Sequence, residues 1–590
     1  MCGIAGIMSS GGEAPPAALL EAMGAALRHR GPDGNGHYRS ADVGIVQTRL
    51  AIIDLATGDQ PLYEPGGAAL LANGEIYNYV ELKATTLAGA AFATQSDCEV
   101  PLHLYRRHGI GFTAELRGMY AIAVHDPAAG RLVLARDPFG IKPLYYAETL
   151  SGLAFASEPQ ALIAAGLVPP TLAPQARNEV LQLQFSTGRE TIFAGIRRLL
   201  PGETVVAMRG RIVERHRREA LPAGPPEPIG EAAGLDRLDK ILADSVRLHQ
   251  RSDVPYGMFL SGGIDSSAVL AMMARLNDRP VRAFTAAFTG SGAHDEREAA
   301  RAVAASFGAE HAVVEFGEAD FWRLLPEIAA AVDDPAADYA VLPTYKLAAA
   351  AHASGLKVIL SGEGGDELFA GYGRYRALMR PWWAGGRMSR GRGNLDGLGI
   401  LRDDLAGWRD GIAAAELKAA SVGRTRLQAA QAMDCADWLP NDLLVKLDRC
   451  LMAHGVEGRT PFLDRRLAEF AFLLPDELKI RRGLGKWLLR RWLAGAAPAA
   501  EAFARKRGFA VPVVEWIAGR GRQLGPLVAA QPAVSEVCRP EAVARLFAQG
   551  TGKHAGFAAW TLLFYALWHR HHILRRPPAP DIFAALDTAG

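Results

Sequence analysis

The sequence of 590 residues has few cysteines, no long apolar run and little net charge. Its five scattered cysteines show no CxxC or Cys/His spacing, which excludes a zinc-binding cluster and favours a reducing compartment. No run of about 18 apolar residues occurs and the N-terminus lacks the regions of a signal peptide, so we expect a cytoplasmic protein without a membrane span. A formal net charge of +2 gives no reason to expect nucleic acid or a membrane as partner.

The chain divides into parts of different composition. Hydrophobic content of 49% and charged content of 22% are typical of a globular protein. Short apolar runs between Gly, Pro and Asp turns predict a β-rich domain over residues 1–210. A Pro- and Gly-rich stretch indicates a linker at 211–230. Strands alternating with helices then predict an α/β domain with a parallel sheet over 231–575, before a flexible tail at 576–590.

Within the second domain, we expect strands beginning at Tyr256 and spanning 281–288 and 357–360. Residues 374–436 lack this regularity and carry several arginines among Gly, Trp and Ser. We predict that they form a solvated insertion or a mobile lid rather than a nucleic-acid patch.

The string LSGGIDSS at 260–267 follows one predicted strand and precedes a predicted helix. Strand, glycine turn and helix N-terminus form a nest of backbone N–H groups at the positive end of the helix dipole, which suits phosphate. Gly262 and Gly263 allow the backbone to approach a ligand closely. Asp265 fits this place if Mg²⁺ lies between its carboxylate and the phosphate oxygens.

Two other loop types do not fit this string. A Walker A loop needs a lysine after its glycines, and a nucleophile elbow needs Gly where Phe259 stands. An ordinary βα turn of small residues is the plain alternative. The full string resembles the pyrophosphate-binding loop of the ATP pyrophosphatase (PP-loop) family, which implies cleavage of ATP between its α and β phosphates.

Cys2 follows Met1, and removal of Met1 would make it the first residue. Its thiolate could then be a nucleophile and its α-amine, with a pKa of about 7.7–8.0, the base. For a cysteine alone, a small buried residue is the plainer interpretation. The strings RLAIID at 49–54, NGEIYN at 73–78 and SDCE at 96–99 favour the nucleophile.

With Cys2, these strings resemble the class II glutamine amidotransferase domain, and RDPFGIKPLYY at 136–146 and FASE at 155–158 extend the match. The resemblance implies an α+β fold of the Ntn type, with a sandwich of two antiparallel sheets flanked by helices. It implies that Cys2 attacks the side-chain amide of glutamine, with Asn73 and Gly74 as the oxyanion hole.

The same resemblance implies a binding site for the glutamine substrate. A guanidinium fork would hold its α-carboxylate, and two carboxylates would receive its α-ammonium. The implied binding residues are Arg49, Asn73, Glu75 and Asp97.

An amidotransferase domain followed by a PP-loop resembles glutamine-hydrolysing asparagine synthetases. Further strings carry this match: VILSGEGGDELFAGY at 358–372, VEGRTPFLD at 456–464, KWLLR at 486–490 and RKRGF at 505–509. The resemblance implies that ammonia released from glutamine attacks a β-aspartyl-AMP made from aspartate and ATP. The implied products are asparagine, AMP, pyrophosphate and glutamate.

Residue roles follow from this second resemblance. Asp265 and Asp366 would hold Mg²⁺, and Lys486 would neutralise charge on the phosphates. Glu363 would orient or deprotonate the ammonia. The residues expected to contact ATP are Leu260, Ser261, Gly262, Gly263, Asp265, Ser266, Ala286, Ser361 and Gly362.

The acceptor site is the part that the sequence leaves open. Its candidates are Lys446, Arg449, Glu457 and Arg459. This stretch departs from the family pattern at 450–451 and at Gly458, so another carboxylate, of a peptide, an antibiotic precursor or a saccharide acid, is the alternative acceptor. A β-lactam synthetase-like cyclase is disfavoured because Cys2 is present. The expected partners are small molecules, and the oligomeric state is left open, with a homodimer as one option.

Overall fold

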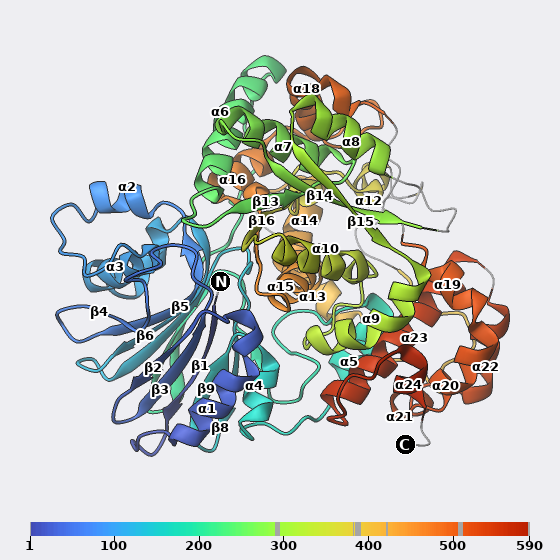
Figure 1. Cartoon of the computed structure of the whole chain (residues 1–590), viewed down its shortest axis with the longest axis horizontal. Coiled ribbons are helices and arrows are strands. Elements are labelled where there is room, and N and C mark those ends of the chain that lie inside the picture. The colour runs from blue at the N-terminus through green and yellow to red at the C-terminus, as the bar shows by residue number, and fades with distance from the viewer. Residues whose placement is uncertain are drawn as a thin grey trace.

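The computed structural model describes residues 2–289, 296–380, 383, 391–420, 423–504, 511–550 and 552–587. Two antiparallel sheets form its first part (Figure 1). The first contains, in spatial order, β10 (Arg197–Arg198), β8 (Tyr145–Thr149), β9 (Gly152–Ala156), β1 (Gly3–Ser9), β3 (Val43–Arg49) and β2 (Gly34–Arg39). The second contains β12 (Arg211–Arg217), β11 (Glu203–Met208), β7 (Arg131–Arg136), β6 (Gly118–Asp126), β5 (Ala69–Ile76) and β4 (Leu62–Tyr63).

The two sheets pack face to face as the expected sandwich. Ile4 and Met8 of β1 share one apolar cluster with Leu71 of β5 and Leu134 of β7, because alternate side chains of each strand point to the inner face. Helices cover the outer faces, α1 and α4 on the first sheet and α3 on the second. The helices of this part are α1 (Ala17–Ala26), η1 (Arg28–Arg30), α2 (Tyr79–Ala84), η2 (Asp97–Glu99), α3 (Val100–His108), η3 (Gly109–Glu115), α4 (Pro159–Ala164) and α5 (Pro174–Leu183).

The second part is built on a parallel sheet, as predicted. Its strand order is β15 (Glu310–Phe316), β14 (Arg282–Phe288), β13 (Tyr256–Phe259), β16 (Val358–Leu360) and β17 (Glu457–Arg459). Val358 and Leu360 face one apolar cluster and Ile359 faces the other, so both faces of the sheet are covered. Since β13 and β16 are neighbours, the loops that follow them lie at the same edge.

Helices follow each strand and fill the rest of the chain. Those around the sheet are α6 (Glu231–His249), α7 (Ile264–Leu276), α8 (Arg297–Ser306), α9 (Glu318–Ala331), α10 (Val341–Ala353), α11 (Gly365–Leu368), α12 (Gly373–Leu378), α13 (Asp410–Ala420), α14 (Arg426–Met433), η5 (Asp434–Leu443), α15 (Leu444–Met452), η6 (Pro461–Leu463), α16 (Arg465–Leu473), α17 (Asp476–Lys479) and α18 (Trp487–Ala496). The last are η7 (Pro498–Ala500), α19 (Val513–Gly519), α20 (Gly521–Ala529), α21 (Pro532–Ser535), α22 (Pro540–Gln549), α23 (Lys553–His572) and α24 (Ile582–Leu586).

Both predicted connecting segments are shorter than expected. The linker prediction of 211–230 is wrong at its start, because β12 pairs with β11 along its length and closes the second sheet. The tail prediction of 576–590 is wrong for α24, whose Ile582 and Leu586 are fully buried. In each case the charged or Pro-rich composition of the stretch does not reveal a short element, β12 or α24, that packs against the protein on one side.

The sequence pattern also failed to predict helices and strands in other parts of the chain. The described parts of 374–436 contain α12, α13 and α14, and Leu427 and Gln431 of α14 are fully buried, so this segment is not a solvated insertion throughout. Strands β15 and β17 were not predicted. β17 is a three-residue strand with charged side chains at both ends, which hides its buried position.

The two parts of the chain share a core. One apolar cluster contains Leu162 and Phe193 of the first part together with Leu325 and Trp568 of the second, and the rings of Phe193 and Trp568 lie 5.4 Å apart.

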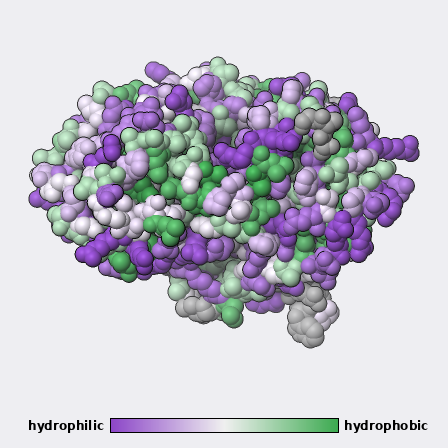
Figure 2. Space-filling view, turned by 90° about the horizontal axis from the view of Figure 1, so that it is seen from below, coloured by the Kyte–Doolittle hydropathy of each residue, from purple (hydrophilic) through white to green (hydrophobic). Residues whose placement is uncertain are grey.

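Figure 1 places the N-terminus at the junction between the two parts. Figure 2 shows hydrophobic residues in small groups between hydrophilic ones on one face. No helix in the described ranges is long and apolar enough to span a membrane.

Candidate functional sites

Cys2 precedes β1 at the junction and is 8% exposed. Its backbone N–H donates to Asn73 Oδ1 at 3.2 Å. Burial raises the pKa of the Cys2 thiol, while a hydrogen bond from the Leu50 backbone and the charge of Arg49 act in the opposite direction. The structure therefore brings Cys2, Arg49 and Asn73 together from three different strings of the sequence.

The Asn73 side chain is fully buried on β5. Its Nδ2 donates to Ser157 Oγ at 3.5 Å, and the same hydroxyl accepts from the Ile4 backbone at 3.0 Å. Gly74 follows on the same strand, where a Cβ would lie 2.3 Å from the Met119 carbonyl, so only glycine fits. The amide of Asn73 is thus fixed beside the Cys2 backbone.

The polar residues expected around glutamine lie on neighbouring segments. Arg49 Nη2 donates to the Asp54 carbonyl at 2.5 Å, and Nη1 donates to Asp59 Oδ1 at 2.7 Å. Asp97 Oδ2 accepts from the Ile76 backbone at 2.6 Å, and burial raises the pKa of Asp97 to about 6. Both side chains are held by protein groups rather than left loose.

Glu75 differs from the other predicted glutamine-binding residues. Its Oε2 lies 3.4 Å from Arg459 Nη2, in the second part of the chain. Burial raises the pKa of Glu75 well above its ordinary range, and the charges of Asp97 and Glu457 add to the effect. The structure therefore places Glu75 at the junction, facing a residue predicted for the other site.

The loop at 260–267 has the expected geometry. β13 ends at Phe259 and α7 begins at Ile264, with Gly263 as its N-cap. Ser266 Oγ donates to the carbonyl of Gly263 at 3.2 Å and lies 3.0 Å from Ser261 Oγ, which accepts from the Gly263 backbone. These bonds shape the turn, and Gly263, Ile264 and Asp265 at the start of α7 line a cavity.

Lys486 joins the two carboxylates predicted to hold magnesium. Its Nζ contacts Asp265 Oδ2 and lies 2.7 Å from Asp366 Oδ1. Burial alone would lower the pKa of Lys486, but the two carboxylates raise it above its ordinary value. Lys486 is 2% exposed and has φ of 59°, a left-handed conformation that costs free energy and is typical of functional sites.

Two glycines make room for this arrangement. A Cβ on Gly371 would lie 1.8 Å from Asp366 Oδ1, and one on Gly365 would lie 2.5 Å from Asp265 Oδ1. The two carboxylates converge on one ammonium group and so suit a divalent cation that also takes phosphate oxygens and water. No cluster of three or more metal-type ligands occurs among the described residues, so the protein alone does not complete such a site.

A cavity of about 620 Å³ lies above the edge of the parallel sheet and collects most of the predicted synthetase residues. Lys446 Nζ enters it, 3.0 Å from Asp338 Oδ2 and 3.9 Å from Glu363 Oε1. Burial raises the pKa of Glu363, although Lys446 opposes the shift. The predicted residues that line it are Leu260, Ser261, Gly263, Asp265, Ser266, Ala286, Ser361, Gly362, Glu363, Asp366, Lys446 and Lys486.

Several predicted residues lie elsewhere. Gly262 lines a neighbouring cavity of about 890 Å³. Three acceptor candidates do not line the cavity of about 620 Å³. Arg449 Nε lies 2.7 Å from Asp333 Oδ1, and Arg459 Nε lies 2.5 Å from Glu457 Oε1. These side chains form buried ion pairs at the junction. The basic string at 505–509 lies outside the described residues.

Sequence reasoning gave no role to several polar residues in and beside the cavity wall, among them Asp338, Tyr372 and Arg376. Tyr372 and Arg376 line the cavity, and Asp338 holds Lys446. Tyr372 closes the string at 358–372 and donates to Glu367 Oε1 at 2.6 Å. No sequence signal marked Arg376, because it follows the string in a segment without clear periodicity.

Comparison with known proteins agrees with this division of the chain. The family model for asparagine synthase matches residues 237–570, and that for the glutamine amidotransferase domain matches 1–217.

Three relatives show the range of similarity. A putative glutamine-hydrolysing asparagine synthetase of Mycobacterium tuberculosis is 34% identical, over 96% of this chain and 97% of the relative. Asparagine synthetase 1 of Bacillus subtilis is 31% identical, over 98% of each chain. Amidase chry2 of Gibberella zeae is 29% identical, over 82% of this chain and 84% of the relative.

Proposed function

The chain belongs to the asparagine synthase family, and from this premise we propose that it is a glutamine-dependent enzyme that amidates aspartate to asparagine. Glutamine-dependent amidation with ATP as substrate is the activity of the family. The acceptor is the part proposed here. The observation that supports it is a single cavity that gathers the PP-loop, Asp366, Glu363, Lys446 and Lys486.

In the proposed first reaction, Cys2 attacks the side-chain amide carbon of glutamine, releases ammonia and forms a thioester that water hydrolyses. Asn73 lies beside the Cys2 backbone and, with the Gly74 N–H, would stabilise the oxyanion; one such donor is worth roughly 10²–10³ in rate. Arg49 would hold the α-carboxylate and Asp97 the α-ammonium.

In the proposed second reaction, the aspartate side-chain carboxylate attacks the α-phosphorus of ATP and expels pyrophosphate. The N-terminus of α7, which no side chain caps, would bind phosphate through its backbone N–H groups. Asp265 and Asp366 would hold Mg²⁺, which screens phosphate charge when bound. Lys486 stays protonated between them and would stabilise the negative charge that develops on the leaving pyrophosphate.

Ammonia then attacks the acyl-adenylate and expels AMP. Glu363 lies in the same cavity, and its raised pKa suits a group that accepts a proton from the attacking nitrogen. Arg376 and Lys446 line this wall and are our candidates for contacts with the α-carboxylate of the acceptor.

The test is a product assay. The protein is incubated with ATP, Mg²⁺, glutamine and aspartate, and pyrophosphate, AMP and asparagine are measured. Equal amounts of the three products, dependent on aspartate, are expected. Glutaminase activity without aspartate-dependent release of pyrophosphate would reject aspartate as the acceptor.

A second candidate acceptor is a different carboxylate on a larger molecule. Two observations favour it: a relative of similar length is named an amidase, and three predicted acceptor residues lie outside the cavity. In that case, pyrophosphate release would depend on the larger acid and not on aspartate.

A further inference from the structure

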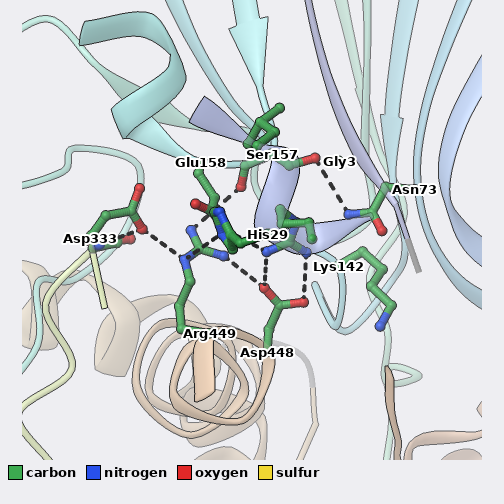
Figure 3. Close-up of polar contacts among 12 residues, drawn as sticks. Gly3, His29, Asn73, Lys142, Ser157, Glu158, Asp333, Asp448 and Arg449 are labelled. Atoms are coloured by element: carbon green, nitrogen blue, oxygen red, sulfur yellow. Dashed lines mark hydrogen bonds and ion pairs between the residues drawn. The ribbon is translucent and has the colours of Figure 1, made fainter. Parts of the chain in front are cut away.

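A buried cluster of charged side chains lies between Cys2 and helix α15. Its members are each at most 4% exposed. Figure 3 shows Asp448 and Arg449 pointing from one helix toward Glu158 and Ser157. Burying charges costs several kcal/mol for each ion unless they are well paired, so a cluster of this size invites a functional explanation. The cluster consists of Arg30, Glu158, Asp333, Asp448 and Arg449.

Arg30 connects this cluster to the proposed nucleophile. Its Nε donates to the Cys2 carbonyl at 3.3 Å, while Nη1 and Nη2 donate to the two oxygens of Asp448 at 2.8 and 3.0 Å. Nη1 also donates to Glu158 Oε1 at 2.7 Å. Because the guanidinium is planar, the two bonds to Asp448 fix the direction in which Nε–H points. The Cys2 carbonyl is therefore placed by a carboxylate of the second part of the chain.

Helix α15 carries both Asp448 and Lys446. Residues two positions apart on a helix point about 200° apart. Lys446 accordingly reaches the cavity that holds Lys486 and contacts Asp338, while Asp448 turns to Arg30. One helix thus contacts the synthetase cavity on one side and the support of Cys2 on the other.

We propose that Asp448 is a positioning residue for glutamine hydrolysis, which acts through Arg30 to hold Cys2 in its reactive position. This inference rests on the proposed role of Cys2. Without the Asp448 charge, Arg30 keeps Glu158 as a carboxylate partner on one nitrogen and its fork is no longer fixed. The thiol then meets the amide carbon of glutamine in a poorer geometry, and a displacement of about 1 Å can cost about 10²-fold in rate.

The chain offers a matched control in Arg198 and Asp334. Arg198 Nε and Nη2 donate to the two oxygens of Asp334 at 2.8 and 2.7 Å, and both side chains are buried. This pair also joins the two parts of the chain. The remaining donors of Arg198 go to Ser186 and to the carbonyls of Gly188 and Glu190 rather than to Cys2. Asp334 reaches the cluster through the Tyr145 hydroxyl, which donates to Asp334 and lies 3.4 Å from Arg449 Nη2. Asp334→Asn therefore breaks an equivalent pair and leaves the bonds that Arg30 makes to Asp448 and to the Cys2 carbonyl in place.

The experiment measures alkylation of Cys2 by the glutamine analogue 6-diazo-5-oxo-L-norleucine, followed by intact mass on the full chain. Varying the reagent gives the maximal rate kinact and the half-saturating concentration KI separately. For Asp448→Asn we expect kinact to fall about tenfold or more, with KI within about twofold of the wild type. Asp334→Asn should lower Tm by a similar amount and leave both constants within about twofold.

A second variant keeps the test decisive if Asp448→Asn does not fold. Arg30→Lys retains the buried charge but loses the fork, and it should show the same fall in kinact. The inference is overturned if Asp448→Asn alkylates at the wild-type rate, or if both Asp variants slow alkylation equally. A wild-type Cys2 that resists the reagent would instead reject the proposed glutaminase, and with it the inference.

Discussion

Arg459 Nη2 lies 3.4 Å from Glu75 Oε2, so a predicted acceptor residue faces a predicted glutamine-binding residue. Arg459 is fully buried, and its Nη1 donates to the carbonyls of His249 and Arg251. The guanidinium is thus held by carbonyls of the second part of the chain and faces Glu75 of the first. Arg459 does not line the cavity that holds Lys486, so our proposal looks to that cavity's wall for the acceptor contacts.

Replacement of Cys2 separates the two proposed reactions. Cys2→Ala should abolish synthesis with glutamine and retain synthesis with ammonium chloride, because the acyl-adenylate cavity is unchanged. The measurement is pyrophosphate release with each nitrogen source. If ammonia does not restore synthesis in this variant, the assignment of separate sites is wrong.

A methyl group at Gly371 should disable the synthetase alone. Its Cβ would lie 1.8 Å from Asp366 Oδ1 and 2.2 Å from Lys486 Cε. We expect Gly371→Ala to lower pyrophosphate release about 10²-fold, comparable to the loss of one charged catalytic contact, while glutamine hydrolysis persists.

The control for this change is Gly495→Ala. Gly495 lies in α18, near Lys486 in the chain, but a Cβ there would meet nothing within 4 Å. This variant should retain pyrophosphate release. Equal losses in the two variants would show that the effect is not specific to the Lys486 site.

Asp97 should make glutamine binding and stability depend on pH. Burial raises its pKa to about 6, so the folded protein binds this proton more tightly than the unfolded chain. Stability from protonated Asp97 is present below about pH 4 and is lost as the pH rises through about 6. Asp97→Asn should therefore raise Tm at pH 7.5 but not at pH 4, measured by thermal unfolding.

The same ionisation should control the KM for glutamine, which should rise as the pH falls below about 6, because a neutral Asp97 attracts the α-ammonium less. A pH-independent KM would contradict the role of Asp97.

Asp54 should affect stability in the opposite direction to Asp97. Burial would raise the pKa of Asp54, but hydrogen bonds from Thr57 and Gln95 hold it below its ordinary value. Asp54→Asn should lower Tm at pH 7.5.

Arg376 tests the acceptor site. Arg376 lines the same cavity as Lys486, and its Nη1 donates to the Gly371 carbonyl at 3.5 Å. Arg376→Met should raise the KM for the acceptor acid about tenfold with a smaller change in kcat, since a bond to a charged group is worth about 1.5–3 kcal/mol. Arg380→Met is the control, because Arg380 is exposed like Arg376 but does not line the cavity. An unchanged KM would remove Arg376 from the site.

The sequence predicted the two folds and the two strands whose following loops carry many of the synthetase residues. The edge at which those loops meet follows from simple rules: β13 and β16 are short apolar runs, and parallel strands present their following loops on one side. Lys486 could be placed there only by resemblance, because α18 follows β16 by more than a hundred residues. Its left-handed φ is invisible in the sequence.

The acceptor candidates that do not line the cavity around Lys486 are buried charges. Arg449, Glu457 and Arg459 lie in strings that match the family, and charged residues in such strings suggest contact with a substrate. Their partners, Asp333 and Glu75, come from distant segments, so periodicity and composition could not show that each charge is already paired. Arg376 was missed for the converse reason, because it lies outside every matched string.

The shared core around Phe193 and Trp568 limits how this enzyme can be taken apart. A cut within 218–230 would separate the two catalytic parts but expose apolar side chains on both. Each fragment would need a solubilising partner, and a glutaminase borrowed from a relative would bring packing residues that do not match Trp568. The two domains that the sequence shows are therefore not independent parts of the structure, because they share one apolar core.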